Sequence, residues 1–187
     1  MAGNVATLNA FNDLADWGAD SIRVGIGGGS ICSTRIQTGH GVPTLQSIID
    51  CSTSDRDVKL IADGGIKTSG DIVKAIAAGA DFVMLGSLLA GTRESPGEMI
   101  VSSNGKSVKV YRGMASEEAQ KDWRGKANSL EGISATVPYK GSVEKVLSKL
   151  SKGIKSGFSY SGARNITEFQ SKSIFLKQSV SSRVESS

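Results

Sequence analysis

Cys32 is the residue of this sequence best placed for covalent chemistry. It lies among glycines and small polar residues that follow an apolar run, with Arg35 nearby. A cysteine attacks as the thiolate, which polar and basic surroundings stabilise. A lone cysteine is more often an inert, small apolar residue, and Cys51, which follows Ile48 and Ile49, fits that interpretation. The sequence therefore predicts a nucleophile at Cys32 and a core residue at Cys51.

Three glycine-containing segments, at 25–29, 63–65 and 86–87, each follow an apolar run. Glycine lets backbone N–H groups approach a phosphate closely, and the start of a following helix adds a favourable dipole. A single glycine pair most often marks only a tight turn. Three such segments in succession predict a ligand that carries a phosphate.

Asp63 ends the second of these apolar runs. Its carboxylate can accept two hydroxyl hydrogen bonds, which is what the 2′,3′-diol of a ribose offers, although a helix cap or a loop ion pair would use the same residue type. His40 is the one histidine, and its place in the cysteine loop favours a loop residue over a catalytic base. Two cysteines and one histidine are too few for a zinc cluster.

The elements that position these residues follow a simple alternation. Apolar runs predict strands over 21–26, 58–62 and 82–85. The spacing of apolar residues predicts helices over 44–51 and 71–78, between these strands, and over 6–17, before the first of them. Single helices between strands imply right-handed βαβ units and a parallel sheet. The segment 18–25 recurs in altered form at 79–86, as successive units of a barrel do. Barrel enzymes bind their ligands at the carboxyl ends of the strands.

The second half of the sequence has a different character. Residues 99–101 and 108–111 predict a hairpin that turns at Asn104-Gly105. Residues 114–135 are polar without a clear period and predict a mobile loop, and 142–156 predict a helix. Its apolar stripe consists of Val143, Val146, Leu147, Leu150 and Ile154. The serine-rich tail from 179 is expected to fray.

Composition excludes several classes of protein. With 187 residues, 39% of them hydrophobic, the chain has room for one domain with a core and no run long enough to span a membrane. No signal peptide is visible, and two cysteines favour a reduced, cytoplasmic setting. Residues 1–100 hold 7 basic and 11 acidic side chains, whereas 101–187 hold 15 and 7. Because aromatics are only 5%, the basic half indicates an anionic ligand or an acidic subunit rather than nucleic acid.

Six motifs together carry a resemblance to a known family. They are GGGSICSTR at 27–35, IADGGI at 61–66, GSLLAG at 86–91, ESPGE at 94–98, YRGM at 111–114 and VPYKG at 137–141. In order and spacing they resemble the IMP dehydrogenase/GMP reductase family over nearly the whole chain. The resemblance implies the C-terminal half of a TIM (β/α)8 barrel, about four βα units that begin at the fifth strand. We expect 1–98 to hold these units, 99–136 the hairpin and flap, and 137–187 the final helix and tail.

The resemblance also implies residue roles. Cys32 would add to C2 of a purine nucleotide, Thr34 and Glu131 would transfer protons, and Arg124 would match the arginine that activates water, although no tyrosine follows it. Asp63 would hold the ribose and the Met114 backbone the base. The remaining substrate residues, most of them around the 5′-phosphate, would be Ser30, Gly65, Gly86, Ser87, Tyr111 and Gly113.

The reaction implied is oxidation of IMP to XMP with NAD, in GMP biosynthesis. The alternatives are an NADPH-dependent GMP reductase, which the short flap favours, and a non-catalytic half-barrel. A further alternative is another phosphate-binding barrel enzyme, for example one that uses flavin, which would share the glycine segments but need no cysteine there. A potassium ion would bind backbone oxygens of Gly27, Gly29, Cys32, Glu185, Ser186 and Ser187. We expect a homo-oligomer, a tetramer by resemblance, and a partner that supplies the first four strands. Without it, inward residues including Val24, Ile26, Leu60, Val83 and Leu85 would lack an opposite wall.

Overall fold

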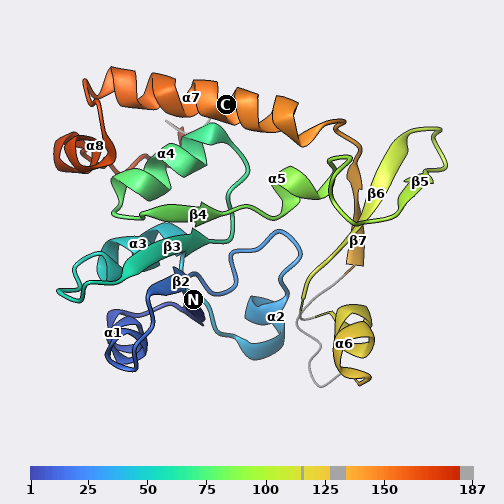
Figure 1. Ribbon diagram of the computed structural model, residues 1–187, viewed down its shortest axis with the longest axis horizontal. Coiled ribbons are helices and arrows are strands. Elements are labelled where there is room, and N and C mark those ends of the chain that lie inside the picture. Colours follow the sequence, from blue (N-terminus) through green and yellow to red (C-terminus); the bar gives the residue numbers. More distant parts are fainter. Residues whose placement is uncertain (115, 127–133, 182–187) are drawn as a thin grey trace.

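The computed structural model describes residues 1–114, 116–126 and 134–181. They form two sheets: a four-stranded parallel sheet in the order β1-β2-β3-β4 and a three-stranded antiparallel sheet in the order β5-β6-β7 (Figure 1). None of the helices within these ranges is long and apolar enough to cross a membrane.

The parallel sheet carries the expected βα units, half of a TIM barrel. Its elements are β1 (Ala2–Val5), α1 (Leu8–Asp16), β2 (Ser21–Val24), α2 (Thr34–Thr38), α3 (Thr44–Cys51), β3 (Lys59–Asp63), α4 (Ser69–Ala77), β4 (Phe82–Met84) and α5 (Ser87–Ala90). Each strand pairs in parallel with the next one along the chain. The strands β2, β3 and β4 and the helices α1, α3 and α4 were predicted from the pattern of apolar residues, whereas β1 and the short helices α2 and α5 were not.

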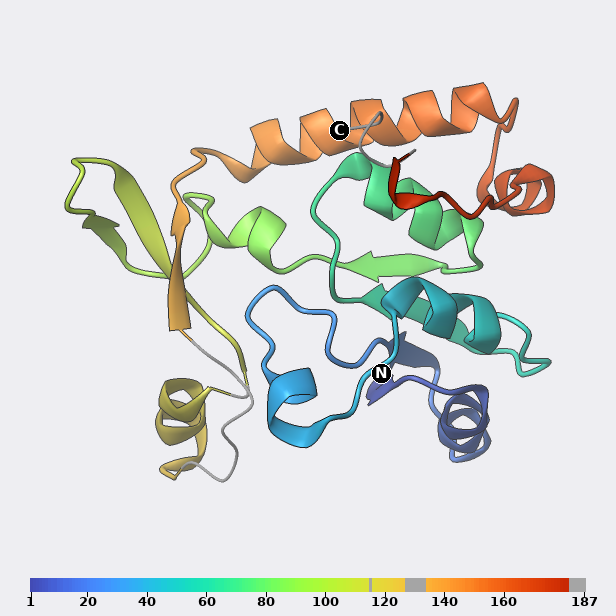
Figure 2. The ribbon, with the colours of Figure 1, turned by 180° about the vertical axis from the view of Figure 1, so that it is seen from behind.

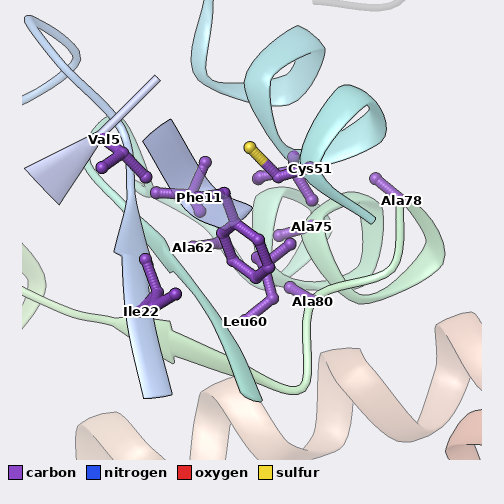
Figure 3. Close-up of a cluster of buried hydrophobic side chains, with 11 residues drawn as sticks. Val5, Phe11, Ile22, Cys51, Leu60, Ala62, Ala75, Ala78 and Ala80 are labelled. Atoms are coloured by element: carbon purple, nitrogen blue, oxygen red, sulfur yellow. The ribbon is translucent and has the colours of Figure 1, made fainter. Parts of the chain in front are cut away.

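The main core lies between this sheet and its helices. Phe11 of α1, Ile22 of β2 and Leu60 of β3 are almost fully buried there, and Cys51 of α3 joins them as predicted (Figure 3). Thr68 and Asp71 start α4 with a capping box, in which each side chain accepts a hydrogen bond from the other residue's backbone N–H. Because the buried residues lie between the strands and these helices, the apolar face of the sheet is the face that the helices cover.

The prediction that Val24 and Leu60 line an open inner face is wrong. Both are buried in the core under the helices, and Val83 and Leu85, partly buried, pack against core clusters as well. Side chains alternate between the two faces of a strand, so the neighbours of these residues point inward. Arg23, Ile61 and Phe82 share that inner face by register, and Phe82 is 58% exposed. Ile26 follows β2 in the cysteine loop.

A second cluster joins α4 to α7 (Val143–Tyr160) and α8 (Ile166–Lys172). Figure 2 shows α7 lying along α4. Leu150 and Phe169 are buried there, and the rings of Phe158 and Phe169 stack at 4.3 Å. The predicted helix is thus confirmed and longer than expected, but Leu147, assigned to its apolar stripe, is 46% exposed.

The antiparallel sheet contains the predicted hairpin and one further strand. Its strands are β5 (Met99–Val101), β6 (Ser107–Arg112) and β7 (Ser134–Pro138). The loop expected over 114–135 is wrong at 117–124, where α6 (Glu117–Arg124) forms. The Ser116 side chain accepts a hydrogen bond from the Ala119 N–H at its start, and Gly125, with φ of 72°, ends it.

Candidate active site

Cys32 is exposed on the loop that follows β2, immediately before α2. Its Sγ lies 3.1 Å from Oγ1 of Thr34, within hydrogen-bonding distance for sulfur. The Cys32 N–H also donates to the Gly29 carbonyl at 3.2 Å, which closes a tight turn. The loop therefore presents a thiol to solvent beside a hydroxyl group that can exchange a proton with it.

The cysteine loop rests directly on the turn that follows β3. A Cβ on Gly64 would lie 3.1 Å from both the carbonyl carbon of Gly28 and the nitrogen of Gly29, and a Cβ on Gly25 would lie 1.9 Å from the Asp63 carbonyl oxygen. Gly64 and Gly65 also have φ of 98° and 80°, which side chains other than glycine rarely adopt. Glycines at these positions thus bring the segment before Cys32 against the end of β3.

Asp63 lies at the carboxyl end of β3, where its Oδ2 accepts a hydrogen bond from Asn4 Nδ2 at 2.7 Å. The guanidinium of Arg23 approaches the same oxygen at 3.9 Å. Asn4 also donates to the Gly25 carbonyl at 2.9 Å, so it joins the ends of β1, β2 and β3. Within the described residues no hydrogen bond reaches Oδ1 of Asp63, and this oxygen can accept one from a ligand.

Tyr111 reaches the carboxyl end of β4 from the other sheet. A Cβ on Gly86 would lie 2.7 Å from the Tyr111 hydroxyl, so this hydroxyl lies against the backbone at Gly86. Ser87 begins α5 directly afterwards. Gly86, Ser87 and Tyr111, all predicted to bind phosphate, are therefore brought together at the strand next to Asp63.

Comparison with known proteins assigns the chain to a protein family. Residues 1–187 match the IMP dehydrogenase / GMP reductase domain. The chain belongs to this family. It is 50% identical over 188 residues to an inosine-5′-monophosphate dehydrogenase of Aquifex aeolicus (strain VF5), which covers 95% of this chain and 38% of the relative. It is 46% identical over 191 residues to a GMP reductase of Leishmania major, covering 96% and 39%.

A solved structure agrees with both the family and the fold. The GMP reductase of Trypanosoma brucei in complex with guanosine 5′-monophosphate superposes with a TM-score of 0.94 at 43% identity. The match covers 100% of this chain and 40% of that one. The chain thus spans about two fifths of the length of its relatives.

Other residues that the family resemblance singled out make no described hydrogen bond with Cys32, Asp63 or Tyr111, or lie outside the described ranges. The guanidinium of Arg124 lies over the ring of Trp123, 4.6 Å from its centre. Met114 is 75% exposed in the turn that Gly113 opens after β6. Glu131 and the segment 185–187 lie outside the described residues, so their predicted roles stay predictions.

Three polar residues at the site were not predicted. Asn4 bonds Asp63, and the lysines Lys109 and Lys140 contact the segment after Gly86. Asn4 could have been found, because it follows Gly3 near the carboxyl end of the first strand. Lys140 lies in the VPYKG motif, but the motif gave it no role, and no local pattern marks Lys109; the partners of both lysines are backbone carbonyls distant in the sequence. Burial lowers the pKa of Lys140 below its ordinary value.

Proposed function

We propose that this chain provides the nucleotide-binding and nucleophilic half of an oxidoreductase that converts IMP to XMP. The observation that carries the proposal is the convergence of Cys32, Asp63 and Tyr111 at adjacent strand ends. A 5′-phosphate would bind the backbone at Gly65 and Gly86 together with side chains of Ser30, Ser87 and Tyr111. Asp63 would then hold the ribose, which directs C2 of the base toward the Cys32 thiol.

In this mechanism the Cys32 thiolate attacks C2, and the hydride on C2 leaves with its electron pair. Water then attacks C2 and displaces the thiolate, which releases XMP and restores Cys32. Thr34, whose Oγ1 lies 3.1 Å from Sγ, would relay protons at these steps with Glu131. Cys32 and Thr34 lie at the end of a loop that packs against the turn after Asp63. This fixed arrangement of the thiol beside the bound ribose lowers the entropy cost of the attack on C2.

The nicotinamide site is assigned to the strands that complete the barrel, because the described glycine segments of this chain already serve the nucleotide. NAD bound there would accept the hydride that leaves C2. A potassium ion would find suitable oxygen ligands in the carbonyls of Gly27, Gly29 and Cys32. The Gly29 carbonyl accepts only the Cys32 N–H among the described hydrogen bonds and keeps a lone pair for a cation.

GMP reduction with NADPH is the second candidate. There the Cys32 thiolate would attack C2 and displace the amino group, which takes up a proton and leaves as ammonia. A hydride from NADPH would then add to C2 and displace the thiolate, which releases IMP. The position of Arg124 favours this candidate, because within the described part of the chain its guanidinium stacks on Trp123 and makes no hydrogen bond to Cys32. Only the dehydrogenase reaction needs an arginine that activates water, and the contact of Arg124 with Trp123 does not support that role.

Turnover is proposed to need a partner that supplies further strands. In the described residues β1 and β4 each pair with one neighbouring strand, so both outer edges of the sheet are open. Open edges and an exposed Phe82 on the inner face indicate a surface that four more strands cover, as expected for a closed eight-stranded barrel. The complete assembly is proposed to be a tetramer of such barrels.

The test combines this chain with the first part of the Aquifex aeolicus relative, up to the matched region. XMP formed from IMP with NAD supports the first proposal, and IMP formed from GMP with NADPH supports the second. Cys32→Ala should abolish turnover while nucleotide binding stays within about tenfold. Full turnover by Cys32→Ala contradicts both. Nucleotide binding without turnover in the presence of the partner would leave a non-catalytic half-barrel. Sedimentation of the chain with and without this partner tests the assembly itself.

A further inference from the structure

Lys109 is a buried lysine whose partners are all backbone carbonyls. It lies on β6 and is only 5% exposed. Its Nζ donates to the carbonyl of Thr92 at 2.9 Å, to that of Arg93 at 3.4 Å and to that of Ser95. None of the ion pairs among the described residues includes Lys109. Burying an ammonium group is costly unless its hydrogen bonds are made, so these carbonyls are held firmly in place.

Lys140 makes a similar contact at the other end of the same segment. Its Nζ donates to the carbonyls of Ser87 and Leu88, each at 3.0 Å. The backbone around it adds two further bonds, from the Lys140 N–H to the Gly91 carbonyl and from the Arg93 N–H to the Gly141 carbonyl, both at 2.8 Å. The segment 87–95 is therefore held at its start by Lys140 and at its end by Lys109.

These bonds also fix Gly86 relative to Tyr111. Lys109 and Tyr111 are two positions apart on β6 and share one face of the strand. Lys109 therefore sets how β6 lies against the segment that begins at Gly86, and this places the Tyr111 hydroxyl against the Gly86 backbone. A phosphate bound by Gly86, Ser87 and Tyr111 would depend on that placement.

We propose that Lys109 and Lys140 are positioning residues, which hold the segment 87–95 against the antiparallel sheet and so set the site for the phosphate of the ligand. The inference rests on the proposed function in one respect, since that function places the phosphate at Gly86. Each lysine donates to carbonyls. Among the described backbone hydrogen bonds, the N–H groups of Leu89 and Ala90 donate to the Gly86 carbonyl, whereas those of Gly86, Ser87 and Leu88 have no backbone partner and can face an anion. The Lys140 ammonium at the Ser87 carbonyl also polarises the N–H of the same peptide unit, that of Leu88, toward stronger donation.

The test uses the 187-residue chain, because every residue proposed to bind the nucleotide belongs to it. Lys140→Met and Lys109→Met are compared with Lys145→Met, which removes an exposed lysine from α7. Lys109→Arg keeps the charge and the donors, and serves as the second variant if Lys109→Met fails to fold. Calorimetry measures the affinity for IMP and for inosine, which lacks the phosphate, and hydrogen exchange is followed in the segment 87–95.

We expect Lys140→Met to weaken IMP binding about tenfold and inosine binding less than about twofold, the scale for one hydrogen bond to a charged group. Exchange in 87–95 should accelerate in Lys140→Met and Lys109→Met, and Lys109→Arg should restore most of the IMP affinity. Lys145→Met should match the unaltered chain in both measurements.

Two results would overturn the inference. One is an equal loss of IMP and inosine affinity, which would assign the lysines a general structural role. The other is unchanged exchange in 87–95, which would show that they do not hold the segment. If the unaltered chain binds no IMP, the proposed nucleotide site is contradicted, and so is the phosphate role of the lysines; accelerated exchange would then support only their hold on the segment.

Discussion

Replacing Asp63 with alanine tests the ribose site most directly. Oδ2 of Asp63 is already bonded to Asn4 at 2.7 Å, which leaves Oδ1 for a ribose hydroxyl, with Oδ2 able to accept a second bond. One to two hydrogen bonds to a charged group correspond to about 2–3 kcal/mol of binding free energy. Asp63→Ala should therefore weaken IMP binding about 30-fold to 150-fold.

The assay is calorimetric titration with IMP and with its 2′-deoxy analogue. The unaltered chain should bind the deoxy nucleotide more weakly, and Asp63→Ala should remove most of that difference, because the hydroxyl has then already lost its acceptor. Asn4→Ala is the matched control, since it removes a neighbour of the carboxylate and keeps Oδ1. A deoxy penalty of the same size in Asp63→Ala and in the unaltered chain would refute the assignment.

The remaining predictions concern reactivity and stability. At about pH 8, iodoacetamide should label Cys32 and spare Cys51, because burial raises the pKa of the Cys51 thiol to about 11; mass spectrometry that finds both labelled in the folded chain would contradict this. Phe11→Ala should cost about 3–5 kcal/mol in urea unfolding, since Phe11 is 2% exposed, whereas Trp17→Ala at 79% exposure should cost little. Asp71 is partly buried, which raises its pKa, but bonds from the backbone of Lys67 and Thr68 outweigh this and lower the pKa below 3.8. The ionised carboxylate therefore stabilises the folded chain above that pH. The difference in melting temperature between Asp71→Ala and the unaltered chain should be constant near neutral pH and disappear as the pH falls through the lowered pKa; a difference that persists in acid would count against the charge.

The residues that could be predicted from sequence were those whose neighbours are close along the chain. The strands β2, β3 and β4 follow directly from apolar runs, and the pair Cys32 and Thr34 lies within one turn. The position of Asp63 at the ligand-binding end of the sheet was predicted correctly, because the carboxyl ends of parallel strands all lie at that end. Local pattern and chain direction were sufficient for these features.

Other features depended on which face of the sheet is covered. Val24 and Leu60 were placed on the inner face because they are apolar, but in a half-barrel the helices bury the outer face first. Arg23 and Phe82 lie inward instead, where register and alternation put them. The helix α6 was missed because its sequence is polar on most sides, and its Ser116 cap was the available signal.

The contact between Lys140 and Ser87 has a consequence for the order in which the protein acquires its site during synthesis. Each strand of the parallel sheet pairs with the next one along the chain, so that sheet can form as the polypeptide emerges from the ribosome. Ser87 must wait for a residue 53 positions later. A nascent chain that has emerged only as far as β5 should therefore already carry the cysteine loop and Asp63 in place, while the turn at Gly86 still lacks Lys109, Tyr111 and Lys140. Translation would complete the thiol and ribose contacts before the phosphate contact. The last part of the site to become rigid would be the turn at Gly86, which follows the outer strand β4.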